Sequence, residues 1–299
     1  MEIFDLAVSY KWEYDKEFVD LIERNFQKDG LRTFVVESFN LNETVSLLKN
    51  KEIHFKAYLD RASDEDPSFL PLAKILSRKK CHLINPHSKV VKSINKASMH
   101  KKLLRKNFRL PQTLILPPYD YDSVLSISED KLISLGKPFV IKPAFFSGGG
   151  EGVVKDAETL SEIETERMKN HNDKYLIQQK IYPRKFKNKR AWFRVFWAFD
   201  KVIPSWWDDH THIYSPVLKS EIKKYNLLPL YRAVARLSRI TKLDYFSTEI
   251  ALTKDHKFFL IDYVNDQCDM RLKSLHPDGV PDIIVKEFID RMKNFVKKI

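Results

Sequence analysis

The stretch KPFVIKPAFFSGGGEGVV, residues 137–154, combines a strand pattern, a lysine and most of the glycine in the chain. Glycine lets a backbone approach a ligand closely and point several N–H groups at it, and phosphate oxygens are the usual acceptors. Lys142, at the end of the apolar strand, adds a positive charge. Of the seven glycines in 299 residues, four fall within five positions: Gly148, Gly149, Gly150 and Gly152. The stretch therefore favours a phosphate-binding loop over an ordinary turn, although it lacks the Gly-Lys-Ser/Thr ending of a P-loop.

The composition is that of a globular protein, with 43% hydrophobic and 12% aromatic residues. The net charge of +12 suits an anionic partner, but the lysines are spread over many helices without a nucleic-acid-binding motif, so a basic solvated surface explains it equally well. No apolar run has the length of a membrane span or of a signal peptide. Cys81 and Cys268 make no disulfide framework. We therefore expect a cytoplasmic protein with no membrane partner, of undetermined oligomeric state.

The first 85 residues alternate between strand and helix patterns. Strands are expected at 3–10, 32–39, 54–62 and 81–85, with helices at 15–30, 42–50 and 69–80. This order predicts an α/β domain with a parallel sheet and helical crossovers. No Gly-x-Gly-x-x-Gly follows the first strand, so the pattern is not a dinucleotide-binding fingerprint.

The remaining chain mixes strands and helices less regularly. A helix and then a strand are expected within 94–116, two strands around Asp200 within 191–207, and a helix with Asp156 as its N-cap over 156–169. Further strands are expected at 138–143, 175–181, 246–253 and 258–264, and further helices at 230–241 and 281–299.

The late strands 246–253 and 258–264 bring two carboxylates together. If they form a hairpin with a four-residue loop, Glu249 faces Asp262 with Cβ atoms about 5 Å apart. Facing carboxylates are destabilising unless a cation lies between them, and Mg²⁺ held by carboxylates and substrate phosphates meets that need. Asn265 would add an oxygen ligand. A shared proton or a lysine bridge is the alternative, but the apolar residues around the pair favour the metal.

These features together resemble the ATP-grasp superfamily. The strand lysine with its Gly-rich loop, a Gln-containing strand, an Arg-containing strand and a late acid pair followed by Asn have the order of that family over about residues 90–270. Within it the sequence is most similar to glutathione synthetase and the ribosomal-protein glutamate ligases. The resemblance implies an N-terminal parallel-sheet (pre-ATP-grasp) domain and two α+β subdomains clasping ATP. Their expected bounds are 1–92, 93–185 with the Gly-rich lid loop, and 186–299 with the Mg²⁺ site.

The resemblance also implies a role for each matched residue. Lys96 and Lys142 would contact the phosphates, and Arg194 would lie near the γ-phosphate, so Arg194 and Lys142 are the expected catalytic residues. The loop over the phosphates would comprise Ser147, Gly148, Gly149, Gly150 and Gly152. The hinge strand that binds adenine would comprise Gln178, Gln179, Lys180 and Ile181. Mg²⁺, with Mn²⁺ as an alternative, would be held by Glu249, Asp262 and Asn265.

The sequence departs from the family pattern in two places. Asp262 and Asn265 are three residues apart rather than the usual two, so on a regular strand they point to opposite faces. A bulge at 263–264, or the end of the strand there, would restore the geometry, and Asp266 is a second choice of ligand. In addition, YPRKFKNKR at 182–190 is wholly basic where an acid usually holds the ribose. Either the ribose is held otherwise, or this segment meets an anionic second substrate.

We therefore expect an ATP- and Mg²⁺-dependent ligase that joins a carboxylate to an amine through an acyl phosphate. Its substrates would be small molecules or peptides. One alternative is a kinase of the same fold that phosphorylates a small, anionic polyol. Another is a nucleotide-binding protein without turnover. Nucleic-acid binding is less expected and would show a steep salt dependence.

Weaker signals lie outside this pattern. SWWDDHTHIYSP, residues 205–216, gathers Trp207, Asp208 and His210 as candidates for an acceptor-substrate pocket. A second metal site using His210 and His212 is disfavoured against an exposed loop over a packed tryptophan, because the pattern has low specificity. Arg271 is a candidate for binding a substrate carboxylate, with a surface ion pair as its alternative.

Overall fold

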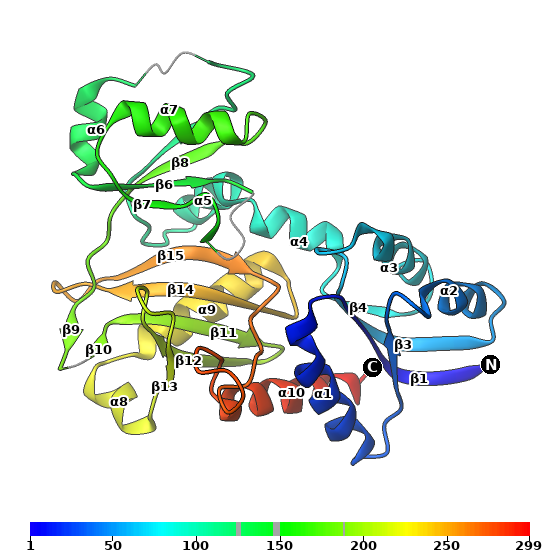
Figure 1. The fold of residues 1–299 in the computed structure, drawn as a ribbon. Helices are drawn as coiled ribbons and strands as arrows, with labels where there is room; N and C mark the ends of the chain where they lie inside the picture. Colours follow the sequence, from blue (N-terminus) through cyan, green and yellow to red (C-terminus); the bar gives the residue numbers. More distant parts are fainter. Residues whose placement is uncertain (124–126, 146–149, 188) are drawn as a thin grey trace. The chain divides into compact units, whose positions relative to one another are not determined.

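The computed structural model describes the 299-residue chain except residues 124–126, 146–149 and 188 (Figure 1). The described residues form two compact units. The first unit comprises Met1–Val90, Val195–Ser247 and Asp266–Ile299, and the second comprises Val91–Arg194 and Thr248–Asn265. The expected division into three domains, with bounds at 92 and 185, stays a prediction.

The first unit contains the parallel sheet that the N-terminal sequence predicts. Its strand order is β2-β1-β3-β4, and each neighbouring pair is parallel. The strands are β1 (Glu2–Tyr10), β2 (Thr33–Val36), β3 (Ile53–Arg61) and β4 (His82–Ile84). They are connected by the helices α1 (Lys16–Gln27), α2 (Leu41–Lys49) and α3 (Leu70–Leu76). Phe55, Tyr58 and Leu72 are among the fully buried residues of its core, which explains the apolar runs in this region.

The rest of the first unit includes the C-terminal helix α10 (Asp282–Val296), which packs against α1. The rings of Phe18 and Phe288 lie 6.1 Å apart across that contact. Its other elements are β12 (Lys201–Trp207), β13 (Tyr214–Pro216), α8 (Lys219–Lys224) and α9 (Leu228–Thr241). Strands β12 and β13 are antiparallel, and α9 packs on β12.

The second unit is built on a four-stranded antiparallel sheet in the order β5-β8-β6-β7. These strands are β5 (Thr113–Leu116), β6 (Phe139–Pro143), β7 (Val154–Ala157) and β8 (Tyr175–Gln179). Helices α6 (Glu129–Leu135) and α7 (Leu160–Lys169) contribute to the core of this sheet through Leu132, Leu135 and Ile163. Helix α5 (Lys96–Arg105) packs against β8 and β15.

Three further strands contribute to the second unit. They are β11 (Trp192–Ala198), β14 (Tyr245–Leu252) and β15 (Phe258–Asn265), which occur in a sheet of order β13-β12-β11-β14-β15. The unit boundaries fall within β11 and β14. The short antiparallel pair β9 (Lys185–Phe186) and β10 (Lys189–Arg190) precedes β11. Within the described residues, no helix is both long enough and apolar enough to cross a membrane.

The predicted start of the helix at 156–169 is wrong. Residues 154–157 form β7, and α7 begins at Leu160 with Thr159 as its N-cap. Thr159 Oγ1 accepts from the Glu162 N–H at 3.3 Å, and Glu162 Oε2 accepts from the Thr159 N–H at 2.9 Å. This capping box is written in the sequence as Thr-x-x-Glu, and it fixes the helix start more strongly than the isolated Asp156.

Smaller differences concern short elements. The loop between β14 and β15 is Thr253–Lys257, one residue longer than expected, and the Thr253 N–H donates to Lys257 O at 3.0 Å. Helix α4 (His87–Ile94), the pair β9 and β10, β13 and α8 have no counterpart in the sequence analysis. They are too short to show a clear hydrophobic period.

Candidate active site

The second unit brings five of the candidate residues into one cluster. These residues are Lys96, Lys142, Arg194, Glu249 and Asp262, and they come from α5, β6, β11, β14 and β15. We call Glu249 and Asp262 the acid pair. The cluster is thus assembled from segments up to 166 positions apart in the sequence, between Lys96 and Asp262.

Lys96 is held by both its backbone and its side chain. Asn95 caps α5 by accepting from the Ser98 N–H at 2.9 Å, so Lys96 is the first helical residue. The Lys96 N–H donates to Ala144 O at 2.8 Å, which ties the start of the helix to the end of β6. Its Nζ lies 3.5 Å from Asp262 Oδ1. The helix start therefore directs this ammonium group at the acid pair.

Lys142 is buried, with 5% of its surface exposed. Its Nζ donates to Ile261 O at 3.0 Å and lies 5.6 Å from the centre of the Tyr263 ring. Burial, assisted by the charge of Lys96, lowers the pKa of Lys142 to about 8, against the opposing effect of the carboxylates of Asp262 and Glu249. An anion bound beside Lys142 would favour its charged form.

Glu249 has two cationic or polar neighbours from β11. It forms an ion pair with Arg194 and accepts from Trp192 Nε1 at 3.1 Å. Burial and the negative charge of Asp262 nevertheless raise the pKa of Glu249, against the opposing effect of Arg194. This mutual repulsion agrees with the expectation that the two carboxylates are neighbours.

Asp262 faces the lysines. Burial raises the pKa of its carboxyl group, but the charges of Lys96, Lys142 and Arg194 outweigh that effect and lower it. Its Oδ1 is shielded from solvent and accepts no hydrogen bond, since Lys96 Nζ is at the outer limit of 3.5 Å. A buried carboxylate oxygen without a hydrogen bond is a candidate ligand for a cation.

The acid pair meets part of the requirement for a magnesium site. Hard oxygen donors from carboxylates and an amide are the ligands Mg²⁺ takes. Glu249 and Asp262 supply the carboxylates, and Asn265 is the half-buried last residue of β15. No group of three or more His, Cys, Asp or Glu side chains within the described part of the chain is arranged to hold a metal ion, so the amide of Asn265 matters to the expected set. Asp266, the second choice, lies in the first unit, where burial raises its pKa to about 6.

Sequence reasoning missed a polar network beneath the cluster. The Tyr263 hydroxyl lies 2.5 Å from His100 Nδ1 and accepts from Gln178 Nε2 at 3.1 Å. Gln178 also donates to Thr113 Oγ1 at 2.9 Å. His100 follows Lys96 by four positions, which puts the two on one helix face, and this spacing was the available signal.

The expected hinge lies at the end of β8. Gln178 is buried and uses its side chain in that network, and the Gln179 N–H donates to Gln112 O at 2.8 Å. The strand ends at Gln179, so Lys180 and Ile181 follow it as irregular backbone. Lys180 forms an ion pair with Asp156 of β7.

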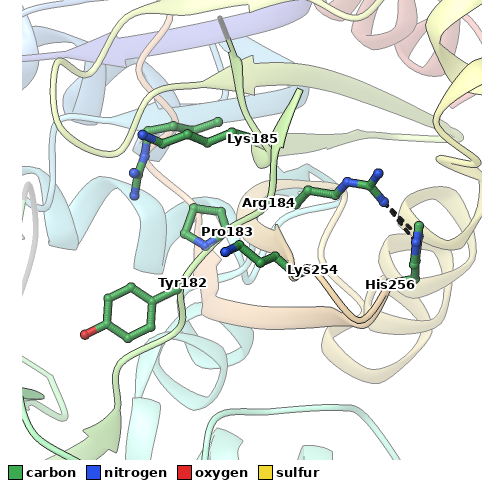
Figure 2. A pocket seen from close by; sticks show the side chains of 7 residues that line it. Tyr182, Pro183, Arg184, Lys185, Lys254 and His256 are labelled. Atoms are coloured by element: carbon green, nitrogen blue, oxygen red, sulfur yellow. Dashed lines mark hydrogen bonds between the residues drawn. The ribbon is translucent and has the colours of Figure 1, made fainter. Parts of the chain in front are cut away.

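A basic pocket follows the expected hinge directly along the chain. Its volume is about 700 Å³, and its lining residues come from the segment after β8 and from the loop between β14 and β15 (Figure 2). They are Tyr182, Pro183, Arg184, Lys185, Arg190, Lys254 and His256. The Arg184 N–H donates to Leu252 O at 2.7 Å and the Leu252 N–H donates to Ala191 O at 2.8 Å, so backbone hydrogen bonds hold the two segments together. We call this site the basic pocket, and it borders the residues that are expected to bind adenine.

The Gly-rich loop is described only in part. Gly150 and Gly152 have φ of +88° and +66°, which are conformations that glycine adopts without strain. Of the other candidate residues in this loop, Ser147, Gly148 and Gly149 lie outside the described residues.

The weaker candidates lie in the first unit. Trp207 is buried and stacks on His212 with ring centres 5.2 Å apart, while Asp208 Oδ1 accepts from the His210 N–H at 2.9 Å and closes a turn. Arg271 forms ion pairs with Asp269 at 2.9 Å and Asp278 at 3.0 Å. Trp207, Asp208 and Arg271 thus make contacts within the protein itself. Their expected roles in substrate binding stay predictions.

Comparison with solved structures identifies the fold. D-alanine–D-alanine ligase from Bacillus anthracis, solved with ATP, is 15% identical, with a TM-score of 0.66 over 100% of this chain and 98% of that chain. The RimK domain ATP-grasp protein from Sphaerobacter thermophilus is 16% identical, with a TM-score of 0.64 over 97% and 99%. The ATP-grasp ligase PsnB, solved with a minimal precursor, Mg and ADP, is 12% identical, with a TM-score of 0.61 over 97% and 98%.

The chain therefore has the ATP-grasp fold, and the predicted fold class is confirmed. No protein-family model matches the sequence, and no curated protein does. The ATP-grasp fold and the partly buried charge cluster are the two observations on which a functional proposal can rest.

Proposed function

We propose that this chain is an ATP- and Mg²⁺-dependent ligase that joins a carboxylate to an amine through an acyl phosphate. The observation that carries the proposal is the partly buried cluster in which Lys96, Lys142 and Arg194 surround the acid pair. Three cations exceed two carboxylates, so the cluster retains positive charge for an anion such as a triphosphate. The ATP-grasp fold adds support, because neighbours of this fold were solved with ATP, or with Mg and ADP.

In the first step, an oxygen of the substrate carboxylate attacks the γ-phosphorus, and the bond to the β–γ bridging oxygen breaks. ADP leaves and an acyl phosphate remains. In the second step, the amine attacks the acyl carbon, phosphate leaves, and the nitrogen loses a proton to give the amide. Neither step needs a protein nucleophile. The work of the side chains is to position the phosphates and to neutralise the negative charge around the transferred group.

The three cations would divide this work by position. Lys96 and Lys142, directed at the acid pair from α5 and β6, would contact phosphate oxygens, and Arg194 would neutralise charge near the γ-phosphoryl group. Both lysines are held by backbone hydrogen bonds or burial, so little reorganisation is needed when the anion binds. We also expect the backbone at residues 179–181 to contact the adenine. The Gly-rich loop would close over the phosphates.

The residues of the acid pair fit Mg²⁺ by donor chemistry. Glu249, Asp262 and Asn265 would hold the ion, and Asp262 Oδ1, which is shielded from solvent, is the clearest of these donors. When bound, the metal would supply positive charge that offsets the charge of the phosphates. Arg194 and Lys96 form ion pairs with the two carboxylates, which offsets the repulsion between them.

A thermal-shift titration with ATP, with and without Mg²⁺, tests the nucleotide site. Saturating ATP, at about a hundred times its dissociation constant, should stabilise the wild type by roughly 2.7 kcal/mol. Lys142→Ala should lose this Mg²⁺-dependent shift. Lys101→Ala is the matched control, because it removes the same charge from an exposed position on α5. No shift in the wild type, or an equal shift in Lys142→Ala, would overturn the assignment.

One observation favours a kinase of the same fold as the second candidate. The segment 182–190 is basic and follows the expected hinge directly, which suits an acceptor that is itself an anion, such as a phosphorylated polyol. Product analysis separates the two reactions, since a ligase releases free phosphate and a kinase leaves it on the acceptor. ATP binding without either product across carboxylate, amine and polyol panels would indicate a nucleotide-binding protein instead.

A further inference from the structure

Tyr263 contacts residues of three other elements of the second unit. It belongs to β15, and only 1% of its surface is exposed. Its ring lies 5.6 Å from Lys142 Nζ of β6, and its hydroxyl group meets His100 of α5 and Gln178 of β8. Tyr263 follows Asp262 on the strand, so the two side chains point to opposite faces. One buried side chain thus connects Lys142 with α5 and β8.

Two hydrogen bonds fix the orientation of the Tyr263 ring. Gln178 Nε2 donates to the hydroxyl oxygen at 3.1 Å, so the hydroxyl proton is left for His100 Nδ1, which lies 2.5 Å away. Gln178 is held in turn, because its Nε2 also donates to Thr113 Oγ1 at 2.9 Å. A buried polar network whose members have their partners is rigid. The ring is therefore held at its hydroxyl end from two sides.

The face of the same ring restricts Lys142. Lys142 Nζ donates to Ile261 O at 3.0 Å and lies within the distance at which a tyrosine ring attracts an ammonium group. A lysine side chain loses much rotamer freedom when it is fixed, and this loss opposes ligand binding when it occurs on binding. Between the carbonyl group and the ring, Lys142 has already lost that freedom, and its remaining N–H groups can donate to an anion.

His100 connects the network with the second lysine of the cluster. It follows Lys96 by four positions on α5, so the two side chains lie on one helix face. Lys96 Nζ lies 3.5 Å from Asp262 Oδ1, and Asp262 precedes Tyr263 on β15. The hydroxyl group of Tyr263 is therefore bonded to the helix that directs Lys96 at the acid pair, while its ring faces Lys142.

We propose that Tyr263 is a positioning residue of the nucleotide site, whose ring holds the ammonium group of Lys142 in place for a phosphate group. The hydrogen bonds of its hydroxyl group with His100 and Gln178 hold the ring. The proposal rests on the ATP-dependent function proposed above. Tyr263 is not itself a catalytic residue, because it is buried and acts on the ligand through Lys142. Fixing the lysine before the anion arrives raises affinity without a new contact.

Calorimetric titration with ATP and Mg²⁺ tests this role. Tyr263→Leu removes the ring and should raise the dissociation constant of ATP about tenfold or more. Tyr263→Phe keeps the ring and loses only the hydroxyl group, so its dissociation constant should stay within about threefold of the wild-type value.

Tyr58→Leu is the matched control for a loss of stability alone. Tyr58 is also 1% exposed, and its hydroxyl group is hydrogen-bonded to Ser9 Oγ at 2.6 Å, but it belongs to the parallel sheet of the first unit. The control removes the same kind of buried ring and should change the dissociation constant of ATP less than about twofold. An equal loss of ATP affinity in Tyr58→Leu and Tyr263→Leu would overturn the proposal.

A measurement without nucleotide separates this proposal from the proposed function. In the protein labelled with ¹³C-lysine, the ε-CH₂ resonance that is lost in Lys142→Arg should lie upfield of the other lysine resonances, because an aromatic ring shields groups over its face. The resonance should stay upfield in Tyr263→Phe and return to the ordinary range in Tyr263→Leu. An unshifted Lys142 resonance in the wild type would overturn the proposal even if Tyr263→Leu does not fold. A wild type that binds no ATP would overturn the proposed function instead, and the resonance would still decide whether the ring holds Lys142.

Discussion

The two charged regions of the second unit are organised in opposite ways. In the cluster around the acid pair, each carboxylate has a cation from another element within reach, Lys96 for Asp262 and Arg194 for Glu249. In the basic pocket, cations from two segments meet without an acid among the described lining residues. The first region is held together by its own charges, whereas the second is held by backbone hydrogen bonds. Opposite charges can therefore stabilise a site before its ligand arrives, and like charges mark a site that the ligand itself must balance.

The largest expected effect on stability comes from disrupting the cluster around the acid pair. Arg194→Met keeps an unbranched apolar side chain but leaves Glu249 largely buried near Asp262 without its ion-pair partner. We expect a loss of about 3–5 kcal/mol in the free energy of unfolding, measured by urea denaturation without metal. Arg194→Met combined with Glu249→Gln should recover much of that loss, because it removes the uncompensated charge. A loss below about 1 kcal/mol for Arg194→Met would mean that the ion pair does not hold the acid pair.

A smaller effect concerns the network beneath the cluster. Burial, assisted by the charge of Lys142, lowers the pKa of His100 to about 4, below the ordinary value of 6.5. Between those values the unfolded chain binds a proton at this residue and the folded chain does not, so stability falls as the pH falls from 6.5 towards 4. The contribution at pH 5 is on the order of 1–2 kcal/mol.

This pH dependence is measured by comparing wild type with His100→Asn. The variant removes the titrating group, so the difference between the two unfolding free energies should shrink as the pH is lowered from 7 to 5. Parallel curves for the two proteins would show that His100 does not titrate differently in the folded state.

The smallest effect concerns the basic pocket. Lys185→Gln/Lys254→Gln should change the free energy of unfolding by less than about 0.5 kcal/mol, because both side chains are exposed to solvent. A slight gain at low salt is expected from the reduced repulsion, and it should vanish as salt is added. A loss above about 1 kcal/mol would assign these lysines a structural role and remove the contrast between the two regions.

Some features of the fold and of the cluster follow from local sequence patterns, and others do not. The parallel sheet of the first unit follows from the alternation of apolar runs, and Lys142 stands out because it ends a strand just before four clustered glycines. Glu249 and Asp262 are recognisable because a hairpin brings residues close in sequence together. Lys96 and Arg194 are different, because their positions were implied by family resemblance rather than by local pattern.

What escapes the sequence is contact between distant segments. Nothing in the pattern shows that Tyr263 meets both His100 and Gln178, since those contacts depend on packing of α5 and β8. The basic segment 182–190 is visible as a charge run, but its meeting with Lys254 depends on how Arg184 pairs with Leu252. Long-range partners are set by tertiary packing, which one sequence records only as apolar positions.

The hairpin of β14 and β15 contains two groups of polar residues in different places, one in its strands and one in its loop. Its strands contain the acid pair, and its loop, Thr253–Lys257, contributes Lys254 and His256 to the basic pocket. Loops tolerate exchange better than the strands they connect. For protein engineering, replacing this loop is therefore the route to a changed ligand preference with the acid pair left in its place. In a family of related chains, the same arrangement would let ligand choice diversify while the strands stay constrained.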